Sequence, residues 1–455
     1  MPYGKTHLTF TLPDELDVQL LAPRDVAGAD DPLATVGAAL DLSPIPSPTK
    51  GGGPISPFPG REGGRGVRYS PVGEGSQGVR VAIAVNDKTR PVPHKVLLPP
   101  LLARLEARGV APEAITLVIA IGTHIPMPVA EFAQVVPAEI LGRYPVISHD
   151  CDAADLVLLG KTRRGVEVRA NRRFMEADLR IVVGNIEPHQ FMGWSGGVKS
   201  ATVGLAGRAT INANHALMTQ PGAELGHYDD NPARQEVEEI GQMMGIGYAL
   251  NVIMNDRKEI VHALAGDPRE VMRQGIPLAR AIFQVAVAEP FDLMIIAPGG
   301  HPKDINIYQA QKALGHAALA MRPGGAVIWA AACPDGAGSK GYEAFMADPA
   351  MTSYEAVLAR YAAEGYRLGP HKAWQIARDA SRVRLRFISD MTPDFARHLL
   401  LNPVADRPGV PPQEQLAQAV ATALAELPAG GRIGVMPWAN ATIPLLCPNS
   451  PSTHR

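Results

Sequence analysis

The chain has 455 residues, of which 46% are hydrophobic and 19% charged, with a formal net charge of −2. This length is too great for one compact core and predicts two domains. The near-neutral charge excludes the strongly basic surface used to bind nucleic acid or anionic membranes. Three widely spaced cysteines, Cys151, Cys333 and Cys447, form no zinc motif or disulfide framework. Because the chain also has no signal-peptide pattern and no apolar run of about eighteen residues, we expect a cytoplasmic protein.

The first part of the chain predicts a parallel sheet. Residues 8–21 alternate weakly and predict a strand or hairpin, whereas residues 43–66 are rich in proline and glycine and predict an extended arm. From residue 79, short apolar runs alternate with helical segments, as in sheets buried on both faces. The expected strands are 79–85, 115–121, 156–159, 179–183 and 249–254, with a helix at about 94–108.

A helical stretch at about 267–286 leads to a second series of elements. Strands are expected at 293–297, 326–332, 383–389 and 432–436, and helices at 307–321, 340–348, 353–364 and 412–426. The fold class is therefore α/β, with two Rossmann-like α/β domains, mainly parallel sheets and an active-site cleft between them. We expect an N-terminal domain over residues 1–278, a C-terminal domain over 279–430, and a strand and tail over 431–455 that can return to the N-terminal domain.

Polar motifs follow several of these strands. Asp87, His124, the segment 184–189 and Gly299 each come just after a predicted strand. Ligands bind at the carboxyl edge of open parallel sheets. We therefore expect these motifs to converge on one crevice.

The glycine-rich segment 185–200 holds His189 and Lys199 and is followed by His215. A lysine in such a turn can bind phosphate or attach to a cofactor, and a histidine can bind a metal. A P-loop needs glycine before its lysine, but this chain has Val198, whose Cβ would obstruct the approach to phosphate. The alternative is a structural turn with a solvated lysine and a core histidine. Packing alone, however, requires no such cluster of histidines, lysine and glycines.

Histidines after two different strands are candidates for acid–base chemistry. His124 and His189 could give or take protons near neutrality, and a pair on opposite sides of a carbon suits a reaction that accepts both enantiomers. Arg90 and Lys312 could bind a small carboxylate. The spacing of Asp87 and Arg90 equally permits a local ion pair, and Lys312 could be an ordinary surface lysine.

Four motifs together resemble the lactate racemase family, whose members use a nickel-pincer nucleotide. They are Asn-Asp-Lys-Thr-Arg-Pro-Val-Pro at 86–93, Gly-Thr-His-Ile-Pro at 122–126, the segment 189–200 with Asn214 and His215, and the Gly-Gly-His-Pro element at 299–312. They occur in the family's order. The resemblance implies an isomerase, a racemase or epimerase that inverts C2 of a 2-hydroxy carboxylic acid such as lactate or malate.

The resemblance also implies a cofactor site. Lys199 would carry a pyridinium-3,5-dithiocarboxylate mononucleotide, and His215 would bind its nickel, since imidazole and sulfur ligands in a tetragonal site suit Ni(II). The other implied cofactor residues are Asp87, Gly196, Gly197, Ser200 and Trp374. Ser200 and the two glycines could bring amides to the phosphate. Trp374 would cover the site, or it belongs to the core.

In the mechanism that the resemblance implies, His124 and His189 are catalytic. One removes the hydroxyl proton while the α-hydrogen leaves as a hydride to the cofactor, and the hydride returns to the other face. Such oxidation is needed because an α-hydrogen beside a carboxylate is too weakly acidic for histidine. The implied substrate residues are Arg90, Tyr308, Gln309 and Lys312. The implied partners are the hydroxy acid and the enzymes of cofactor biosynthesis.

The chain departs from the lactate enzymes at Val198, Thr123 and Val203-Gly204, where they commonly carry arginine, an aromatic residue and Pro-Gly. The first two of these positions, 198 and 123, border the expected pocket, so the particular hydroxy acid stays open. Two other functions also stay open. A phosphotransferase or ATPase would use Lys199 on phosphate, and a non-catalytic cofactor carrier would not need the two catalytic histidines.

Overall fold

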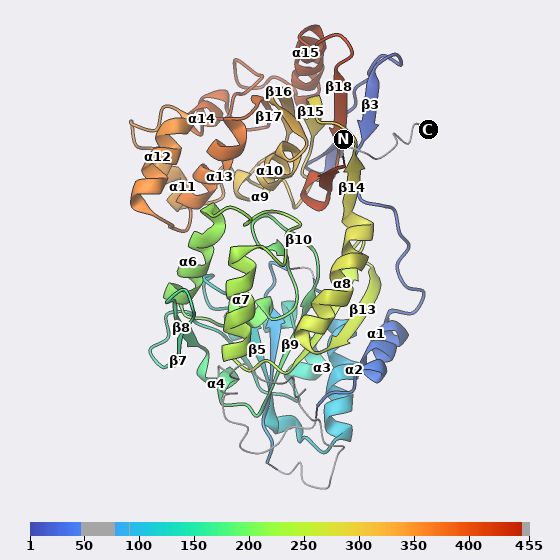
Figure 1. The fold of residues 1–455 in the computed structure, drawn as a ribbon, viewed down its shortest axis with the longest axis vertical. Coiled ribbons are helices and arrows are strands. Elements are labelled where there is room, and N and C mark those ends of the chain that lie inside the picture. The colour runs from blue at the N-terminus through green and yellow to red at the C-terminus, as the bar shows by residue number, and fades with distance from the viewer. Residues whose placement is uncertain (47–77, 91, 448–455) are drawn as a thin grey trace. The chain divides into compact units, whose positions relative to one another are not determined.

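The computed structural model describes residues 1–46, 78–90 and 92–447, which form two compact units (Figure 1). The first unit is residues 25–281, and the second unit is residues 1–24 with 282–455. The expected boundary at 278/279 lies close to the observed one at 281/282, but residues 1–24 belong to the second unit. Most of the expected arm at 43–66 lies outside the described residues.

The first unit is built on a six-stranded sheet. Its order is β13 (Ile260–Gly266), β12 (Tyr248–Met254), β9 (Leu179–Asn185), β4 (Val81–Asn86), β5 (Ile115–Ala120) and β6 (Val146–Ser148). All neighbours are parallel except β12 and β13, which pair antiparallel at one edge. The predicted α/β class with mainly parallel strands is confirmed.

The two faces of this sheet carry different side chains. Val81, Ile83 and Val85 of β4 point into an aliphatic core with Leu97 and Leu101 of α2 (His94–Ala107), against which α1 (Pro32–Leu42) also packs. The opposite face is lined by smaller or polar residues, because strand residues alternate between faces. These residues are Ala82, Ala84, Val182, Gly184 and Asn251.

Further helices belong to this unit. They are α4 (Arg172–Met175), α5 (Lys199–Thr202), α6 (Arg208–Ala216), α7 (Pro232–Met243) and α8 (Pro268–Phe283). A small hairpin of β10 (Pro188–His189) and β11 (Gly193–Trp194) precedes α5. Helix α3 (Ala138–Leu141) and 3₁₀ turns at Pro112–Ala114, Val129–Gln134 and Leu217–Thr219 complete the unit.

One predicted strand of the sheet was assigned wrongly. The run at 156–159 forms β7 (Val157–Lys161), which pairs antiparallel with β8 (Glu167–Ala170) in a separate hairpin. Its residues are only partly buried, so it lacks the two-sided burial of a central parallel strand. The edge of the sheet is instead β6, whose three residues are too few for a periodic pattern.

The second unit contains an all-parallel five-stranded sheet. Its order is β17 (Arg384–Ile388), β16 (Met321–Ala330), β15 (Phe291–Ile296), β18 (Arg432–Met436) and β3 (Asp17–Leu20). The expected terminal strand, β18, therefore lies in this sheet and does not return to the first unit. Strand β14 (Gln284–Val287) pairs with β19 (Ile443–Leu446), and β1 (Pro2–Tyr3) pairs with β2 (Thr6–His7).

Both faces of the second sheet are covered. Met294, Ile296 and Trp329 share a core with residues of α9 (Ile307–Ala310), α10 (Lys312–Ala318), α11 (Lys340–Met346) and α13 (Pro370–Ala380). Leu293 and Ile328 on the opposite face pack with α15 (Pro412–Ala425). Helices α12 (Tyr354–Glu364) and α14 (Pro393–His398) and a 3₁₀ turn at Ala439–Ala441 lie around them. The single helix expected at 307–321 is two helices that meet at Gln311.

No helix among the described residues is both long enough and apolar enough to span a bilayer.

Candidate active site

Three of the four predicted motifs lie at one edge of the first unit's sheet. Strands β9, β4 and β5 are neighbours, and their carboxyl ends lead to His189, Asp87 and His124 respectively. The fourth motif begins at Gly299, just after β15, at the corresponding end of the second unit's sheet. The candidate residues thus form two groups, one in each unit.

His124 is held by a buried carboxylate. Its Nδ1 lies 2.8 Å from Asp87 Oδ2, and the Asp87 side chain is 4% exposed while that of His124 is 49% exposed. Because the carboxylate accepts the Nδ1 proton, the Nε2 atom of the neutral ring is left as a base. The sequence assigned Asp87 to the cofactor, and in this structure its carboxylate contacts and orients His124.

Asp87 also contacts two neighbours in its own loop. Thr89 Oγ1 donates to Asp87 Oδ1 at 2.6 Å, and Arg90 Nη1 lies 3.6 Å from the same oxygen. The local ion pair that the spacing permitted is therefore present. Burial raises the pKa of Asp87, but the hydrogen bonds from His124 and Thr89 and the charge of Arg90 outweigh it, so the pKa lies below its usual value. Arg90 itself is 43% exposed and keeps donors available for an anion.

His189 occupies the end of the short hairpin after β9. It pairs with Gly193 across β10 and β11, and its Nδ1 accepts a hydrogen bond from the Met192 amide at 3.2 Å. In the neutral ring the proton is then on Nε2. Gly193 has a φ of +70°, and a Cβ there would lie 1.5 Å from the His227 carbonyl oxygen, so this turn requires glycine.

Phe191 links the candidate catalytic and metal-binding histidines. Its ring makes edge-to-face contacts with His189, at 4.9 Å between centroids, and with His215, at 5.2 Å. Phe191 is buried, and its carbonyl accepts from the Asn231 side chain at 2.9 Å. One buried aromatic ring thus contacts both imidazoles.

The lysine-bearing loop packs closely on the small-residue face of the sheet. A Cβ at Gly184 would lie 2.9 Å from the Ser200 hydroxyl and 3.2 Å from the Asn86 carboxamide oxygen. The Gly197 amide donates to Asn251 Oδ1 at 2.7 Å. This amide is therefore used within the protein, although the sequence suggested it for a phosphate. The same bond argues against a P-loop, in which such amides face the ligand.

Helix α7 holds this loop from the other side through Arg234, which is fully buried. Its guanidinium binds Glu238 Oε1 at 2.6 Å and donates to the carbonyls of Trp194 and Gly196, each at 3.1 Å. Val198, the residue before the lysine, packs on Gly241 of α7, where a Cβ would lie 2.7 Å from the Val198 Cβ. Val198, at which the chain departs from the family, thus faces α7. From the sequence we had expected this residue to border the pocket.

Helix α7 also positions His215. Asn214 of α6 donates from its side chain to the Ala233 carbonyl at 2.8 Å, which ties the last turn of α6 to the start of α7. Both α5, which begins at Lys199, and α6, which carries His215, pack against α7. The amine and the imidazole that the sequence assigned to the cofactor therefore lie on two helices that both pack against α7.

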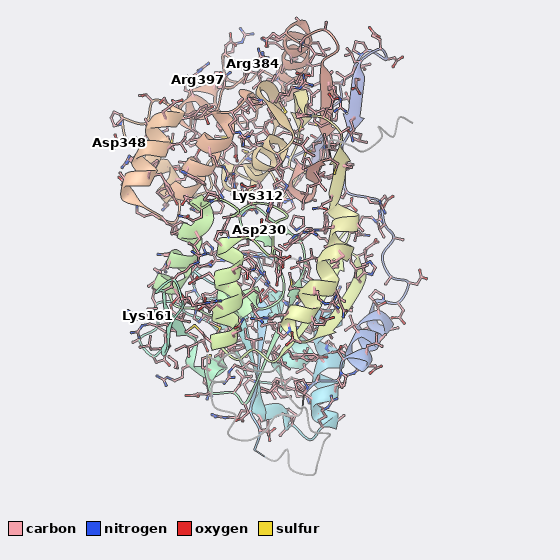
Figure 2. The ribbon with its side chains drawn as sticks, in the orientation of Figure 1. Lys161, Asp230, Lys312, Asp348, Arg384 and Arg397 are labelled. Atoms are coloured by element: carbon pink, nitrogen blue, oxygen red, sulfur yellow. The ribbon has the colours of Figure 1, made fainter. Side chains whose placement is uncertain are left out.

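The second unit brings together Tyr308, Gln309 and Lys312. Tyr308 and Gln309 lie on α9, which Asn306 caps by accepting from the Gln309 amide at 3.1 Å. Lys312 begins α10 (Figure 2), and its Nζ donates to Gln309 Oε1 at 2.9 Å. All three side chains are half-buried. They form one polar group with a positive charge, which suits a carboxylate.

Trp374 lies on α13 and is partly buried. Its ring is 5.7 Å from that of Tyr361, and the Arg378 guanidinium lies 5.1 Å from its centroid. These contacts place it among the aromatic residues of α12 and α13. They support the reading of Trp374 as a packing residue.

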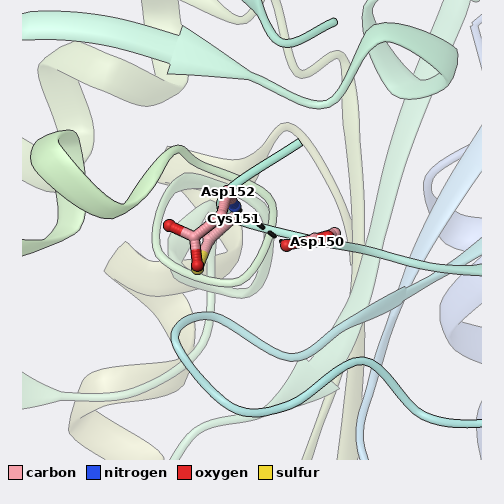
Figure 3. A group of neighbouring side chains, drawn as sticks. All are labelled: Asp150, Cys151 and Asp152. Atoms are coloured by element: carbon pink, nitrogen blue, oxygen red, sulfur yellow. Dashed lines mark hydrogen bonds between the residues drawn. The ribbon is translucent and has the colours of Figure 1, made fainter. Parts of the chain in front are cut away.

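A different cluster, Asp150-Cys151-Asp152, brings three potential metal ligands within 4.8 Å of one another (Figure 3). The Asp152 carboxylate is engaged by Arg208, whose Nε and Nη2 donate to its two oxygens at 2.7 and 2.6 Å. The Asp152 amide also donates to Asp150 Oδ1 at 2.9 Å. The contacts describe a surface turn stabilised by an ion pair.

Several residues that shape this site were not found from the sequence. Phe191, Asn251 and Arg234 act through contacts with distant parts of the chain. Asn251 stands in the middle of an apolar strand, and a polar residue at such a position was a usable signal. Arg234 resembled any charged residue of an amphipathic helix.

The geometry is that of an α/β protein with histidines and a lysine at one edge of a mainly parallel sheet. Two family models match the chain, the lactate racemase N-terminal domain over residues 72–226 and the lactate racemase C-terminal domain over residues 286–394. The chain is 31% identical to the lactate racemase of Thermoanaerobacterium thermosaccharolyticum over 349 residues, which are 75% of this chain and 76% of that protein. It is 33% identical to the lactate racemase of Lactiplantibacillus plantarum over 272 residues, 59% of this chain and 63% of that protein.

Solved structures agree with this assignment. The lactate racemase apoprotein from T. thermosaccharolyticum superimposes with a TM-score of 0.81 at 25% identity, covering 98% of this chain and 99% of that one. A crystal structure of a protein from Thermotoga maritima shares the fold, with a TM-score of 0.57 at 16% identity over 81% of this chain and 94% of that chain. The chain belongs to the lactate racemase family and is a lactate racemase-like isomerase.

Members of this family use a nickel-pincer nucleotide. The first unit fits such a group in two respects. Lys199 and His215 supply an amine and an imidazole on α5 and α6, which both pack against α7. The carboxamide oxygen of Asn86, buried beside Gly184, has no hydrogen-bond partner among the described residues, as expected of a polar group whose partner is a ligand.

Proposed function

We propose that this chain inverts the C2 stereocentre of a small 2-hydroxy carboxylic acid, with His124 and His189 as the acid–base pair. The observation that carries the proposal is the arrangement of Asp87, His124 and His189 after three neighbouring strands of one sheet. A racemase must handle protons on both faces of a carbon, and two histidines with unlike partners suit that task.

The two rings are prepared differently. Asp87 accepts a hydrogen bond from the Nδ1–H group of His124, so Nε2 of that ring is free to take the hydroxyl proton. The charge of Asp87 then stabilises the imidazolium that results. The Met192 amide donates to Nδ1 of His189, so that Nε2 of this ring donates to the substrate oxygen. The opposite enantiomer requires the two rings to exchange these roles. The proton of neutral His189 must then lie on Nδ1, which requires the hydrogen bond from the Met192 amide to break.

The cofactor would be held by Lys199 through a covalent bond and by His215 through nickel, and when bound it supplies a hydride acceptor. Phe191 fixes the His215 ring against His189. Arg90, Tyr308, Gln309 and Lys312 are the residues we propose for binding the substrate carboxylate and hydroxyl groups.

The test uses protein produced together with the cofactor-biosynthesis enzymes and loaded with nickel. Racemisation is measured with lactate, malate, aromatic hydroxy acids and aldonic acids. His124→Ala and His189→Ala should each lower the rate in both directions by roughly 10²–10⁴-fold. Near wild-type racemisation by either variant would show that its histidine is structural.

Intact-mass spectrometry separates loading from catalysis. The wild-type chain and both histidine variants should carry an added mass that is missing from Lys199→Ala. An active Lys199→Ala protein would exclude attachment at this lysine. Magnesium-dependent ATP hydrolysis by the wild-type chain would instead favour the phosphotransferase alternative.

A further inference from the structure

A buried lysine lies behind the polar group of the second unit. Lys372, on α13, has only 6% of its surface exposed. Its Nζ donates to Gln375 Oε1 at 2.9 Å and lies 4.7 Å from the centroid of the Tyr308 ring. The cation is thus held against the face of a residue that we expect to contact the substrate.

The surroundings of Lys372 are positive or neutral. The charge of Lys312, on α10, opposes that of Lys372. The Tyr308 ring on α9 lies against its ammonium. His371, the preceding residue on the same helix, contacts the ring of Tyr366 at 5.6 Å between centroids. Over the described ranges, no carboxylate lies within ion-pair distance of the Lys372 ammonium. Burial, and then Lys312, hold the pKa of Lys372 well below its usual value.

Such an arrangement is unusual for packing alone. Lysine is almost never fully buried unless it is paired, and an uncompensated buried ammonium is strongly disfavoured. The amide of Gln375 and the ring of Tyr308 offset part of that cost but carry no net charge. A negative ligand near Tyr308 would supply the missing charge.

We propose that Lys372 is a charge-recognition residue for the substrate, whose carboxylate balances the buried ammonium beneath Tyr308 when the 2-hydroxy acid binds. This proposal rests on the proposed function, in which Tyr308, Gln309 and Lys312 bind that acid. Lys372 acts through the electrostatic field and through the position of Tyr308, without contacting the substrate itself. Protonation of Lys372 and binding of an anion are then coupled, and the coupling is reciprocal.

The coupling can be measured with glycolate, the smallest 2-hydroxy acid. Full-length protein carrying ¹³Cε-lysine is titrated by NMR, and the Lys372 resonance is identified by its loss in Lys372→Arg. Glycolate should raise the pKa of Lys372, and a rise of one unit corresponds to about tenfold tighter binding to the protonated form. Glycolamide, which is neutral, should leave that pKa unchanged. Affinity for glycolate should therefore increase as the pH falls through the pKa of free Lys372.

Substitutions supply an independent measurement. At a pH below the pKa of free Lys372, Lys372→Met should weaken glycolate binding about tenfold, whereas Lys372→Arg, which keeps the charge, should retain most of it. Lys340→Met, which removes an exposed lysine of the same unit, is the matched control and should bind like the wild type. In loaded enzyme, Lys372→Met should raise KM more than it lowers kcat. If Lys372→Met fails to fold, the titration of the wild-type protein still decides.

Two results would overturn the inference: glycolate binding that leaves the Lys372 resonance unmoved, or no binding of glycolate at all. Failure of the proposed function looks different. If glycolate shifts the pKa of Lys372 but the loaded protein racemises no hydroxy acid, the anion site stands and the proposed racemase function is wrong. Racemisation with an insensitive Lys372 would reject only the role of this lysine.

Discussion

Asp87 serves three neighbours at once, because its two oxygens contact His124, Thr89 and Arg90. A buried carboxylate is stable in the charged form only when donors and cations surround it. This pairing makes His124 a base with a defined tautomer and places Arg90 beside it. The aspartate thereby links proton transfer to carboxylate binding through one side chain.

Replacement of this carboxylate should have a pH-dependent effect on stability. Hydrogen bonds from His124 and Thr89 and the charge of Arg90 hold the pKa of Asp87 below its usual value despite burial. A lowered pKa stabilises the folded state above the unfolded-state pKa, and this contribution is lost as the pH falls through the folded-state pKa. Asp87→Asn should therefore lower the free energy of unfolding by roughly 1–3 kcal/mol at pH ~7. The difference should shrink below pH ~4; urea unfolding at both pH values measures it. An equal loss at both values would contradict the assignment.

Phe191 offers a second test at the residue scale. Phe191→Leu removes the edge-to-face contacts with His189 and His215, each worth roughly 0.5–1.5 kcal/mol. We expect lower stability and less bound nickel per chain, measured by urea unfolding and metal analysis of loaded protein. The control is Phe132→Leu, which alters the core on the opposite face of the same sheet and should leave the nickel content unchanged. Wild-type nickel content in Phe191→Leu would show that His215 needs no aromatic support.

The sequence was sufficient to place some of these residues. Asp87 and His124 follow apolar runs that become adjacent strands, and the ion pair of Asp87 with Arg90 follows from local spacing. The roles of Arg234 and Asn251 depend on register between distant segments, which no local pattern encodes. Their contacts could only be found once the strands and helices were in place.

At the scale of elements, the loop of residues 196–200, which carries Lys199, packs closely between the sheet and α7. Gly184 admits Ser200 on one side and Gly241 admits Val198 on the other. Side chains at these two positions would force the loop outward, so the small residues determine how closely α5 approaches the sheet. Such close contacts explain why glycines occur inside a strand and a helix, where glycine otherwise weakens both.

Two helical glycines should therefore respond oppositely to the same substitution. In α7, Gly241→Ala would place Cβ 2.7–2.8 Å from side-chain carbons of Val198 and should destabilise the protein by roughly 1–3 kcal/mol. In α1, Gly37→Ala meets only a flexible arginine atom 3.8 Å away and should stabilise it by up to about 1 kcal/mol. Thermal unfolding of both variants gives the comparison. Stabilisation by both would mean that Val198 moves aside freely.

Most elements of the fold follow from apolar runs, but edge elements do not. Central strands such as β9 and β12 are mostly apolar segments in which every residue is buried. The edge strand β6 has three half-buried residues. The sequence of β7 is apolar over a few positions, like that of a buried strand, although its residues are partly exposed. Position in a sheet is a tertiary property, so short runs carry too little signal to distinguish an edge from a separate hairpin.

At the scale of the whole molecule, the chain begins and ends in the same unit. Strand β3 adds to the free edge of β18, and the buried Leu21 donates its amide to the Val435 carbonyl at 2.8 Å. Near the N-terminus, the Gly4 amide donates to Asp304 Oδ2 at 2.7 Å. The first residues thus support the loop that leads to Tyr308. The sequence suggested a strand near residue 20 but not its partner, which lies over four hundred positions away.

This arrangement predicts which fragments fold. Residues 25–281 should unfold in one cooperative transition, and adding residues 1–24 should leave its free energy of unfolding unchanged within about 0.5 kcal/mol, because the partners of those residues are in the second unit. Residues 282–455 alone should be unstable, since they lose β3, Leu21 and the Gly4 hydrogen bond, and a peptide of residues 1–24 added in trans should restore their fold. Circular dichroism during urea titration, with and without the peptide, measures each fragment. A fragment 1–281 that is clearly more stable than 25–281 would instead support the domain of residues 1–278 expected from sequence, and would place the N-terminal strand in the unit that carries Lys199.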